Sequence, residues 1–244
     1  MGRPRALVVI PCLNEEAALP RVVADVRAAQ ASLPAELTVV VVDDGSSDGT
    51  ARIARELGVR VVRLCRNLGI GGAVQTGLRL GAREGFDCAV QLDGDGQHPA
   101  AEMAALLAGF AAEPAPDLVI GSRFTGSGAF RSTFMRRVGI RWLALLLRFL
   151  MRIRITDPTS GFRLYGPRAL ALFDEVYPYD YPEPESLALA TVAGLRVVEV
   201  PVTMRERLGG ASSISGLLAA WYMLKVTFAV LLTFLRSFAS RRTK

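Results

Sequence analysis

Short apolar runs alternate with longer segments of helical periodicity over the first 120 residues. A short apolar run bounded by turn-forming residues predicts a buried strand, and apolar residues that recur every three or four positions predict a helix. The expected strands are Ala6–Ile10, Leu37–Val42, Val59–Leu64, Cys88–Leu92 and Leu118–Gly121. The expected helices are Glu16–Ala31, Thr50–Leu57, Gly72–Glu84 and Pro99–Ala111. This alternation predicts an α/β fold, with a mostly parallel sheet that carries helices on both faces.

The pattern changes after Gly121. A loop rich in Gly and Ser leads into an amphipathic helix at about residues 136–152, in which Trp142 and Phe149 alternate with arginines. A polar turn at 157–165 precedes a further strand, and Leu195–Val202 is again typical of a strand. We expect one domain over residues 1–213, followed at 214–244 by a hydrophobic helix and a basic tail.

The segment Leu217–Leu235 is almost wholly apolar and has nearly the length needed to cross a bilayer. Lys225 lies near its middle, however, and a central lysine costs roughly 2.5–3.5 kcal/mol on insertion scales. The residues that follow are basic. We therefore expect a helix that lies on a membrane surface or packs against a partner, with a true span and a buried helix as the alternatives.

Charge is distributed unevenly along the chain. Residues 118–156 contain eight arginines and no acid, and residues 208–244 contain five basic residues and no acid. Removing these from the 29 basic residues leaves 16 against 23 acidic residues, a balance of −7. An acidic body with two basic stretches argues against a general nucleic-acid binder and favours a local anionic partner, either phosphate groups or a membrane surface.

The cysteines and the N-terminus bear on the compartment. Cys12, Cys65 and Cys88 are scattered in apolar contexts, which predicts buried free thiols and no disulfide framework. The apolar run at the N-terminus is too short for a signal peptide and soon meets polar residues. We expect the protein in the cytoplasm or on its membrane face.

Acidic residues follow the predicted strands. Asp93 and Asp95, with Gln97 two positions further on, come directly after Cys88–Leu92. Two carboxylates and an amide carbonyl converge where glycines allow a sharp bend, and such oxygen ligands suit Mg²⁺ or Mn²⁺. The alternative is a solvated Asp-Gly turn. A position at a strand end favours the metal site, because ligands bind there in parallel α/β sheets.

Two further strand ends carry candidate binding residues. The adjacent carboxylates Asp43 and Asp44 repel each other, which a simple capped turn does not explain, and one of them could accept a ribose hydroxyl or a base N–H. The run Gly69–Gly72, with Gly71 at its centre, resembles a phosphate-cradling loop but lacks the spacing of the dinucleotide and Walker motifs. No G-x-S-x-G element is present, so a serine hydrolase is disfavoured as well.

The combination of motifs is far more specific than its parts. In order they are Pro11-Cys12-Leu13-Asn14-Glu15, Asp43-Asp44-Gly45-Ser46, Arg66-Asn67-Leu68-Gly69, Asp93-Gly94-Asp95-Gly96-Gln97-His98-Pro99, Gly121-Ser122-Arg123 and Asp157-Pro158-Thr159-Ser160-Gly161-Phe162-Arg163. Over residues 5–215 this series resembles the family 2 glycosyltransferases of the GT-A fold, and within them the polyprenyl-phosphate enzymes similar to dolichyl-phosphate mannose synthase.

The resemblance implies a role for each motif. The nucleotide-sugar donor would lie among Pro11, Asn14, Glu15, Asp43, Asp44 and Gly71. Asp93, Asp95 and Gln97 would hold Mg²⁺ or Mn²⁺ on its diphosphate. Arg123 and Arg136 would receive the phosphate of a polyprenyl-phosphate acceptor, and Arg207 would reach the donor diphosphate. Departures at Leu13, Gly94, Gly96 and Ser213 leave the sugar and the nucleobase open. Glu183 and Glu185 are expected to contact sugar or acceptor, or else to lie in a rigid surface loop.

The implied reaction is direct displacement by a phosphate oxygen with inversion at the sugar, at the cytoplasmic face of the cell membrane. The arginine-rich helix and the C-terminal helix would attach the enzyme to an anionic bilayer, peripherally or through a C-terminal anchor; pairing of the arginines with acids of the body is the alternative. A small membrane partner or a second copy of the chain could complete the site.

Two other functions stay open. A hydroxyl acceptor on a lipid-linked saccharide or polysaccharide precursor would need a carboxylate base, for which Asp157 or Glu183 is the candidate. A scaffold that has lost activity is the other alternative, and the presence of Asp93, Asp95 and Gln97 argues against it.

Overall fold

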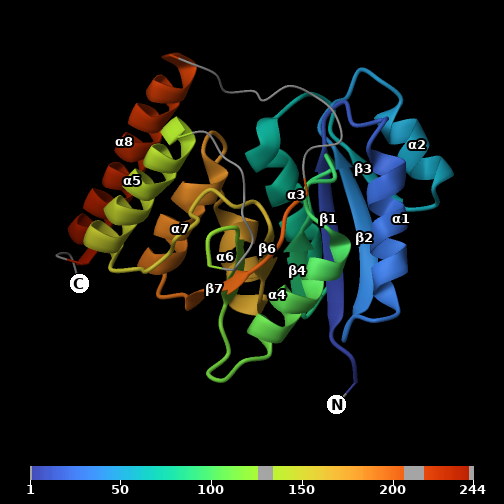
Figure 1. Cartoon of the computed structure of the whole chain (residues 1–244), viewed down its shortest axis with the longest axis horizontal. Helices are drawn as coiled ribbons and strands as arrows, with labels where there is room; N and C mark the ends of the chain where they lie inside the picture. The colour runs from blue at the N-terminus through green and yellow to red at the C-terminus, as the bar shows by residue number, and fades with distance from the viewer. Residues whose placement is uncertain (1, 126–133, 206–216, 242–244) are drawn as a thin grey trace.

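The computed structural model describes residues 2–125, 134–205 and 217–241, and some side chains within the last two ranges are not described. A seven-stranded sheet in the order β3-β2-β1-β4-β6-β5-β7 runs through the molecule (Figure 1). Its strands are β1 (Arg5–Cys12), β2 (Glu36–Asp43), β3 (Arg60–Arg63), β4 (Cys88–Gln91), β5 (Leu118–Ser122), β6 (Arg163–Tyr165) and β7 (Val197–Pro201).

All neighbouring strands are parallel except β6, which runs antiparallel to both β4 and β5. The prediction of a mostly parallel α/β sheet is therefore confirmed. The five strands expected before residue 122 are all present. The sequence did not indicate that the short strand after the polar turn would insert between β4 and β5.

Helices cover both faces of the sheet because successive strand residues point to opposite sides. The helices are α1 (Leu19–Gln30), α2 (Thr50–Glu56), α3 (Gly69–Arg83), α4 (Met103–Phe110), α5 (Phe134–Met151), α6 (Pro167–Glu175), α7 (Pro182–Val192) and α8 (Leu217–Arg241). One core cluster joins α1 and α4 to residues such as Val8 and Val90. The opposite cluster joins α3, α6 and α7 to residues such as Leu7 and Ile120.

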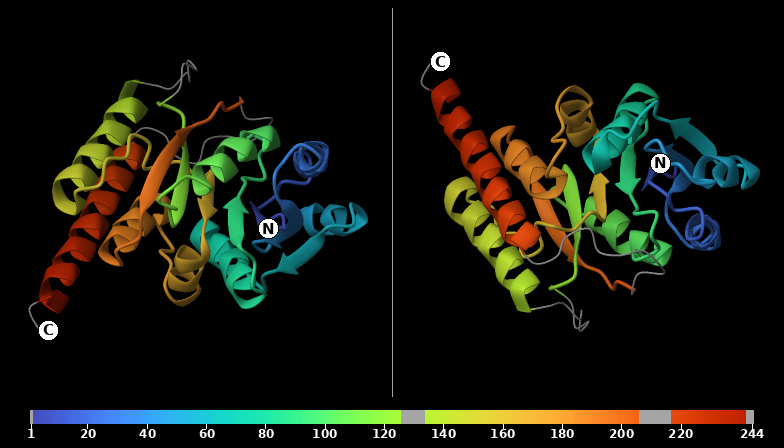
Figure 2. Two further views of the ribbon diagram at one scale, coloured as in Figure 1. Left: turned by 90° about the horizontal axis from the view of Figure 1, so that it is seen from below. Right: turned by 90° about the horizontal axis from the view of Figure 1, so that it is seen from above.

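The helices α5 and α8 lie side by side at the end of the molecule farthest from α1 and α2 (Figure 2). Buried Leu143 and Leu147 of α5, with Val226 and Val230 of α8, extend the core cluster of α3, α6 and α7. Within the described ranges, no helix combines the length and apolar character that crossing a membrane requires.

The helix α7 was not expected. Its first turn contains Pro182, Glu183, Pro184 and Glu185, which the sequence suggested could form a rigid surface loop. Proline is tolerated there because the N–H groups of a first helical turn have no partner within the helix. Both glutamates therefore lie at a helix N-terminus, where the helix dipole favours negative charge.

Candidate functional site

The predicted polar clusters meet at one edge of the sheet. Cys12, at the end of β1, is paired in register with Asp43, at the end of β2. Asp93 lies two residues beyond β4, whereas Arg123 directly follows β5. Since β1, β2, β4 and β5 share one direction, their carboxyl ends open on the same side. This edge holds the candidate site.

The loop after β1 is braced against the loop after β2. The N–H of Asn14 donates to Ser46 Oγ (3.0 Å), and Asn14 Oδ1 accepts the N–H of Ser47 (2.9 Å). The N–H of Glu15 donates to Thr50 Oγ1 (2.9 Å). Asn14 has φ 56°, a left-handed conformation that asparagine tolerates better than most residues. The described contacts of the Asn14 side chain are thus with the protein, while Pro11 and Cys12 are buried beneath it.

Asp43 and Asp44 are both buried and have separate partners. Asp43 Oδ1 accepts the N–H of Ser46 (3.0 Å), and Arg63 Nε lies 3.2 Å from Asp43 Oδ2. Asp44 Oδ1 accepts the N–H of Leu68 (2.7 Å). Burial raises the pKa of the Asp44 carboxyl, although the backbone N–H groups beside it act in the opposite direction. Separate partners explain how two neighbouring carboxylates are accommodated.

The Asp93–Gln97 turn packs tightly on the end of β1. Gly96 has φ 76°, and Asp95 Oδ1 accepts the N–H of Gln97 (3.0 Å). A Cβ at Gly94 would lie 2.8 Å from Cys12 Sγ. His98 Nδ1 accepts the N–H of Asp93 (3.3 Å), so the single histidine supports the turn rather than serving only to start a helix.

The Asp93 carboxylate lies close against Gly161 and is partly exposed. A Cβ at Gly161 would lie 3.2 and 3.3 Å from the two carboxylate oxygens, and the Asp93 side chain is 33% exposed. Asp93, Asp95 and the half-buried Gln97 carry oxygen atoms of the type that Mg²⁺ and Mn²⁺ take as ligands. The donor chemistry therefore fits such an ion, although the described residues contain no cluster of three or more His, Cys, Asp or Glu side chains suited to a metal.

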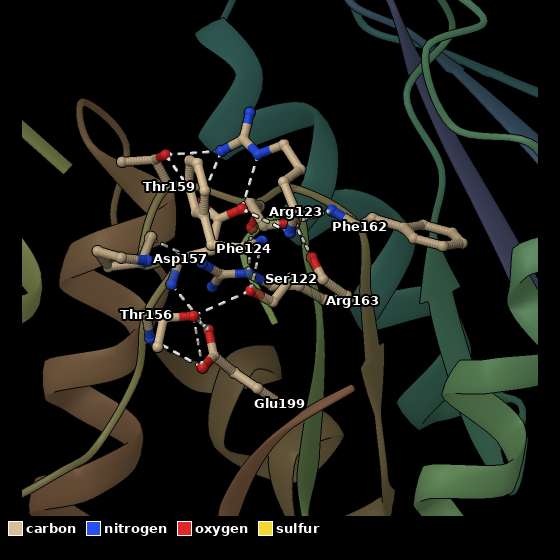
Figure 3. Close-up of polar contacts among 12 residues, drawn as sticks. Ser122, Arg123, Phe124, Thr156, Asp157, Thr159, Phe162, Arg163 and Glu199 are labelled. Atoms are coloured by element: carbon tan, nitrogen blue, oxygen red, sulfur yellow. Dashed lines mark hydrogen bonds and ion pairs between the residues drawn. The ribbon is translucent and has the colours of Figure 1, made fainter. Parts of the chain in front are cut away.

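Arg123 and Asp157 form a buried ion pair (Figure 3). Arg123 Nε lies 2.6 Å from Asp157 Oδ2, and Arg123 Nη2 lies 2.7 Å from Oδ1. Arg123 Nη2 also donates to Thr159 Oγ1 (2.9 Å). Asp157 is fully buried with both oxygens engaged, so the structure argues against this residue as a base. The Nε and Nη2 groups of Arg123 already donate to Asp157. A phosphate could accept from both of them only by sharing these donors with the Asp157 carboxylate or by displacing it.

Arg163 is a fully buried residue whose role the sequence analysis missed. Its guanidinium donates to the carbonyl oxygens of Ser160 (2.7 Å), Pro158 (3.2 Å) and Glu183 (2.9 Å), and to Ser186 Oγ (2.8 Å). It thereby ties the 157–161 loop to the first turn of α7. The available signal was a lone arginine between Phe162 and the apolar residues of a short strand.

Glu183 lies at the same junction. Burial raises the pKa of the Glu183 carboxyl, the positive charge of Arg163 opposes that rise, and the negative charge of Asp93 adds to it. The weaker influence of Arg123 lowers the same pKa. The charges of Asp93, Arg163 and Arg123 therefore all influence the Glu183 carboxyl.

Gly71 does not form an open phosphate cradle. A Cβ at this position would clash with the carbonyl oxygens of Pro178 and Tyr179, and the residue is buried. The close approach of the α6–α7 connection explains why glycine is needed there. The expected role of Gly71 in donor binding stays a prediction.

Two arginines that the sequence analysis placed in the site, Arg136 and Arg207, lie partly or wholly outside the described residues. Arg136 lies in α5, but its side chain falls outside the described residues, as does the whole of Arg207. The nearest described residue to Arg207 is Arg205, whose N–H donates to the carbonyl oxygen of Gln97 (2.9 Å). The segment that leads to Arg207 is thus attached to the Asp93–Gln97 turn.

The outer side of α5 and α8 is apolar. We define the α5/α8 face by exposed large apolar side chains that recur every three or four positions: Met135, Val138, Trp142, Leu145 and Phe149, with Trp221, Leu224, Phe228, Leu232 and Leu235. This spacing places them on the helix sides opposite the buried residues. Trp142 Nε1 donates to Thr227 Oγ1 (3.0 Å), which joins the two helices. Exposed arginines at 137, 141 and 148 lie on α5, and exposed Arg152 directly follows it.

Two of the three cysteines are buried as expected, and Cys65 is exposed. Burial, with nearby carboxylates, raises the pKa of Cys12 well above its ordinary range, and burial raises that of Cys88 to about 12. Both buried thiols are therefore protonated and unreactive at neutral pH.

The family model described as "Glycosyl transferase family 2" matches residues 7–172. The chain is 36% identical over 222 residues to the polyprenol monophosphomannose synthase of Mycolicibacterium smegmatis, covering 87% of this chain and 82% of that one. It is 35% identical over 233 residues to the undecaprenyl-phosphate mannosyltransferase of Micrococcus luteus, covering 91% and 93%.

Solved structures share the fold at lower identity. The mannosyl-3-phosphoglycerate synthase of Rubrobacter xylanophilus has a TM-score of 0.69 at 16% identity, covering 99% of this chain and 76% of that one. The glucosyl-3-phosphoglycerate synthase of Mycobacterium tuberculosis, in complex with Mn²⁺, UDP-glucose and phosphoglyceric acid, has a TM-score of 0.67 at 23% identity, covering 95% and 79%.

Proposed function

Because the chain belongs to glycosyl transferase family 2, we propose that it transfers a hexose from a nucleotide-sugar donor to a polyprenyl phosphate. Relatives named for polyprenol and undecaprenyl-phosphate acceptors align with most of their own length. The observation that carries the proposal is the 157–161 loop. Its first residue binds Arg123, and its last borders the Asp93 carboxylate. One short loop thus joins an acidic donor side to a basic acceptor side.

The donor nucleotide would lie over the ends of β1 and β2. Asp44 offers a buried carboxylate that can accept a base N–H or a ribose hydroxyl, and Pro11, Asn14, Glu15 and Asp43 shape the surrounding loops. The bonds from Asn14 and Glu15 to the β2–α2 loop hold these loops together before a ligand binds. Such preorganisation lowers the entropic cost of binding.

Asp93, Asp95 and Gln97 would hold Mg²⁺ or Mn²⁺ on the donor diphosphate. The bound ion would supply positive charge that stabilises the leaving diphosphate. The chain itself fixes the turn through Gly96, His98 and the contact with Cys12. Arg207 would add a second positive charge, since the segment before it is bonded to the carbonyl oxygen of Gln97.

The acceptor needs alignment more than activation. A phosphate oxygen is already nucleophilic at neutral pH, so the protein must direct it at the anomeric carbon, opposite the leaving diphosphate. Arg123, oriented by Asp157, would attract the acceptor phosphate, and Arg136 would contribute a second cation. Direct displacement inverts the configuration at the sugar and requires no covalent intermediate on the protein.

We further propose that the α5/α8 face lies against the cytoplasmic side of the cell membrane. Apolar side chains would enter the boundary between headgroups and acyl chains, and the arginines of α5 would attract anionic lipids. This placement would deliver the phosphate of a membrane-embedded lipid to Arg123.

A hydroxyl acceptor is the second candidate function, and Glu183 is the observation in its favour. Among the two carboxylates considered as bases, Asp157 is fully engaged by Arg123, whereas Glu183 is half-buried beside the site with a raised pKa. A carboxyl with a raised pKa is better matched to proton abstraction near neutral pH.

A donor panel decides between these functions. The purified full chain is mixed with polyprenyl phosphate in detergent and with radiolabelled UDP- or GDP-hexoses, with and without Mn²⁺, and lipid extracts are analysed for polyprenyl-phosphate sugar. Label in the lipid monophosphate supports the proposal. Label found only in a saccharide whose formation is abolished by Glu183→Gln supports the second candidate, and refutes the first.

A further inference from the structure

Glu199, in the edge strand β7, accepts hydrogen bonds from Thr156 and Asp157, so its carboxylate is bonded to the loop that carries Asp157. We propose that Glu199 is a positioning residue, which sets the direction of Arg123 toward the acceptor phosphate by holding the backbone of Thr156 and Asp157. This inference rests on the proposed function, because it assigns Arg123 to the acceptor side.

The bonds form a continuous path (Figure 3). Glu199 Oε2 accepts the N–H of Thr156 (2.8 Å), and Glu199 Oε1 accepts the N–H of Asp157 (2.7 Å). The Asp157 carboxylate then accepts the Nε, Nη2 and backbone N–H of Arg123. Glu199 thus binds two consecutive backbone amides. These bonds restrict the backbone at Asp157, and with it the direction in which the Asp157 side chain leaves the backbone.

The Thr156 hydroxyl joins the path to β5. Its Oγ1 lies 3.1 and 3.3 Å from the Glu199 carboxylate oxygens and 3.0 Å from Ser122 Oγ. Ser122 in turn directly precedes Arg123. Thr156 is therefore bonded both to Glu199 and to the residue before Arg123.

A partly buried carboxylate at position 199 is unfavourable unless hydrogen-bond donors stabilise its charge. Burial of Glu199 disfavours the ionised form, and the neighbouring negative charge of Asp157 adds to this effect. The backbone N–H groups of Thr156 and Asp157 and the Thr156 hydroxyl lower the pKa of Glu199 and so favour its ionised form. Glu199 gives one acceptor oxygen to each amide, whereas the NH₂ group of a glutamine in the same orientation would face one of the two N–H groups.

Asp117 provides a matched comparison for a purely structural role. It lies at the opposite end of β5, where Asp117 Oδ2 also accepts a backbone amide across the β5–β7 pair, that of Arg196 (2.7 Å), and pairs with Arg168 (3.0 Å). Loss of either carboxylate should weaken the attachment of β7. Only loss of Glu199 should change the acceptor side.

The test measures steady-state kinetics of the full-length wild type, Glu199→Gln and Asp117→Asn, each with the donor and the polyprenyl phosphate varied in turn. We expect Glu199→Gln to lower kcat/KM for the acceptor about 10- to 100-fold, as misplacement of a reacting group does, and to leave the donor KM within about twofold. Asp117→Asn should lower the thermal midpoint about as much as Glu199→Gln does, and it should leave the acceptor kcat/KM unchanged.

A double variant tests the path itself. If Glu199 acts through Arg123, then Glu199→Gln combined with Arg123→Lys should lose no more acceptor kcat/KM than Arg123→Lys alone. Fully additive losses, or an equal change in donor KM, would overturn the inference. Glu199→Asp, which keeps the charge but shortens the side chain, provides the same comparison should the glutamine variant fold poorly. A wild type that glycosylates no lipid phosphate would instead refute the proposed function.

Discussion

The donor side and the acceptor side of the site are built differently. On the donor side, Asp43, Asp44, Asp93 and Asp95 lie at or just beyond the ends of parallel strands, and local bonds such as Asp95 to Gln97 shape the turns. On the acceptor side, Arg123 depends on Asp157, 34 positions away, and Asp157 depends on Glu199, 42 positions further on. The acidic residues of the first arrangement could be placed from the local sequence, whereas the partners of the second could not.

The difference has a physical origin in charge burial. The donor side leaves Asp93 one-third exposed, so a cation can approach it. The acceptor side buries a complete ion pair, and removing either partner leaves an uncompensated charge in a low-dielectric interior. We therefore expect substitutions on the donor side to affect turnover, and those on the acceptor side to affect turnover and stability together.

The largest effect is expected from Asp93→Asn. Loss of this carboxylate should lower kcat about 100- to 1000-fold, as removal of a major electrostatic contributor does, with the thermal midpoint nearly unchanged. Calorimetry with Mn²⁺ and donor should show weakened binding. Asp87→Asn is the matched control, because Asp87 flanks the opposite end of β4 and accepts the N–H of Arg5. Equal losses in both variants would contradict a local role of the turn.

The next effect is the stability change of Asp157→Asn. Arg123 would keep its charge in a buried place without a counterion, which should cost about 3 kcal/mol in the free energy of unfolding. Urea denaturation measures this cost. The donor affinity should remain near that of the wild type, and a donor affinity that fell in parallel with stability would show that the two sides are not separable.

A smaller effect concerns the membrane. Replacing Arg137, Arg141 or Arg148 by Gln should weaken sedimentation with vesicles containing anionic lipid about fivefold for each residue, since a basic side chain near such a surface contributes about 1 kcal/mol. Neutral vesicles should show little change. Arg21→Gln, on the exposed side of α1 at the other end of the molecule, should behave as the wild type. An equal loss from Arg21→Gln would exclude the α5/α8 face as the membrane surface.

The smallest effect is a pH dependence at the junction of the two sides. Burial raises the pKa of Glu183 in the folded protein. Folding is then accompanied by proton uptake just above the ordinary carboxyl pKa, so stability should fall as pH rises through this window and level off above the folded-state pKa. Glu183→Gln should remove that fall. Its thermal midpoint, relative to wild type, should rise between pH 4.5 and pH 7, and a constant difference would contradict the assignment.

The fold was largely predictable because hydrophobic periodicity reports burial directly. The five strands before residue 122 and the helix at 136–152 were placed within a few residues of their observed bounds. The acidic turn was predictable for a related reason: a glycine-rich acidic segment after a buried run has few other places to lie. Gly71 shows the limit of this reasoning, since its neighbours Pro178 and Tyr179 are distant in the sequence.

The helix α7 and the residues Arg163 and Glu199 could not be predicted in this way. Two prolines in four residues are more typical of a loop than of the first turn of a helix, so the start of α7 was not recognised. A single charged residue in a short strand forms no periodic pattern. Arg163 becomes understandable only when four oxygen acceptors from two segments surround it.

The sequence alone determined the strands along the chain, and it predicted the edge of the sheet that holds the candidate site and its oxygen-rich turn, because these depend on neighbouring residues. Tertiary structure alone decided that β6 inserts antiparallel, that Asp157 and Arg123 form a buried ion pair, and that the exposed apolar side chains of α5 and α8 come from two packed helices. Those features depend on which distant side chains share a low-dielectric interior, where each buried charge and each backbone amide must find a partner.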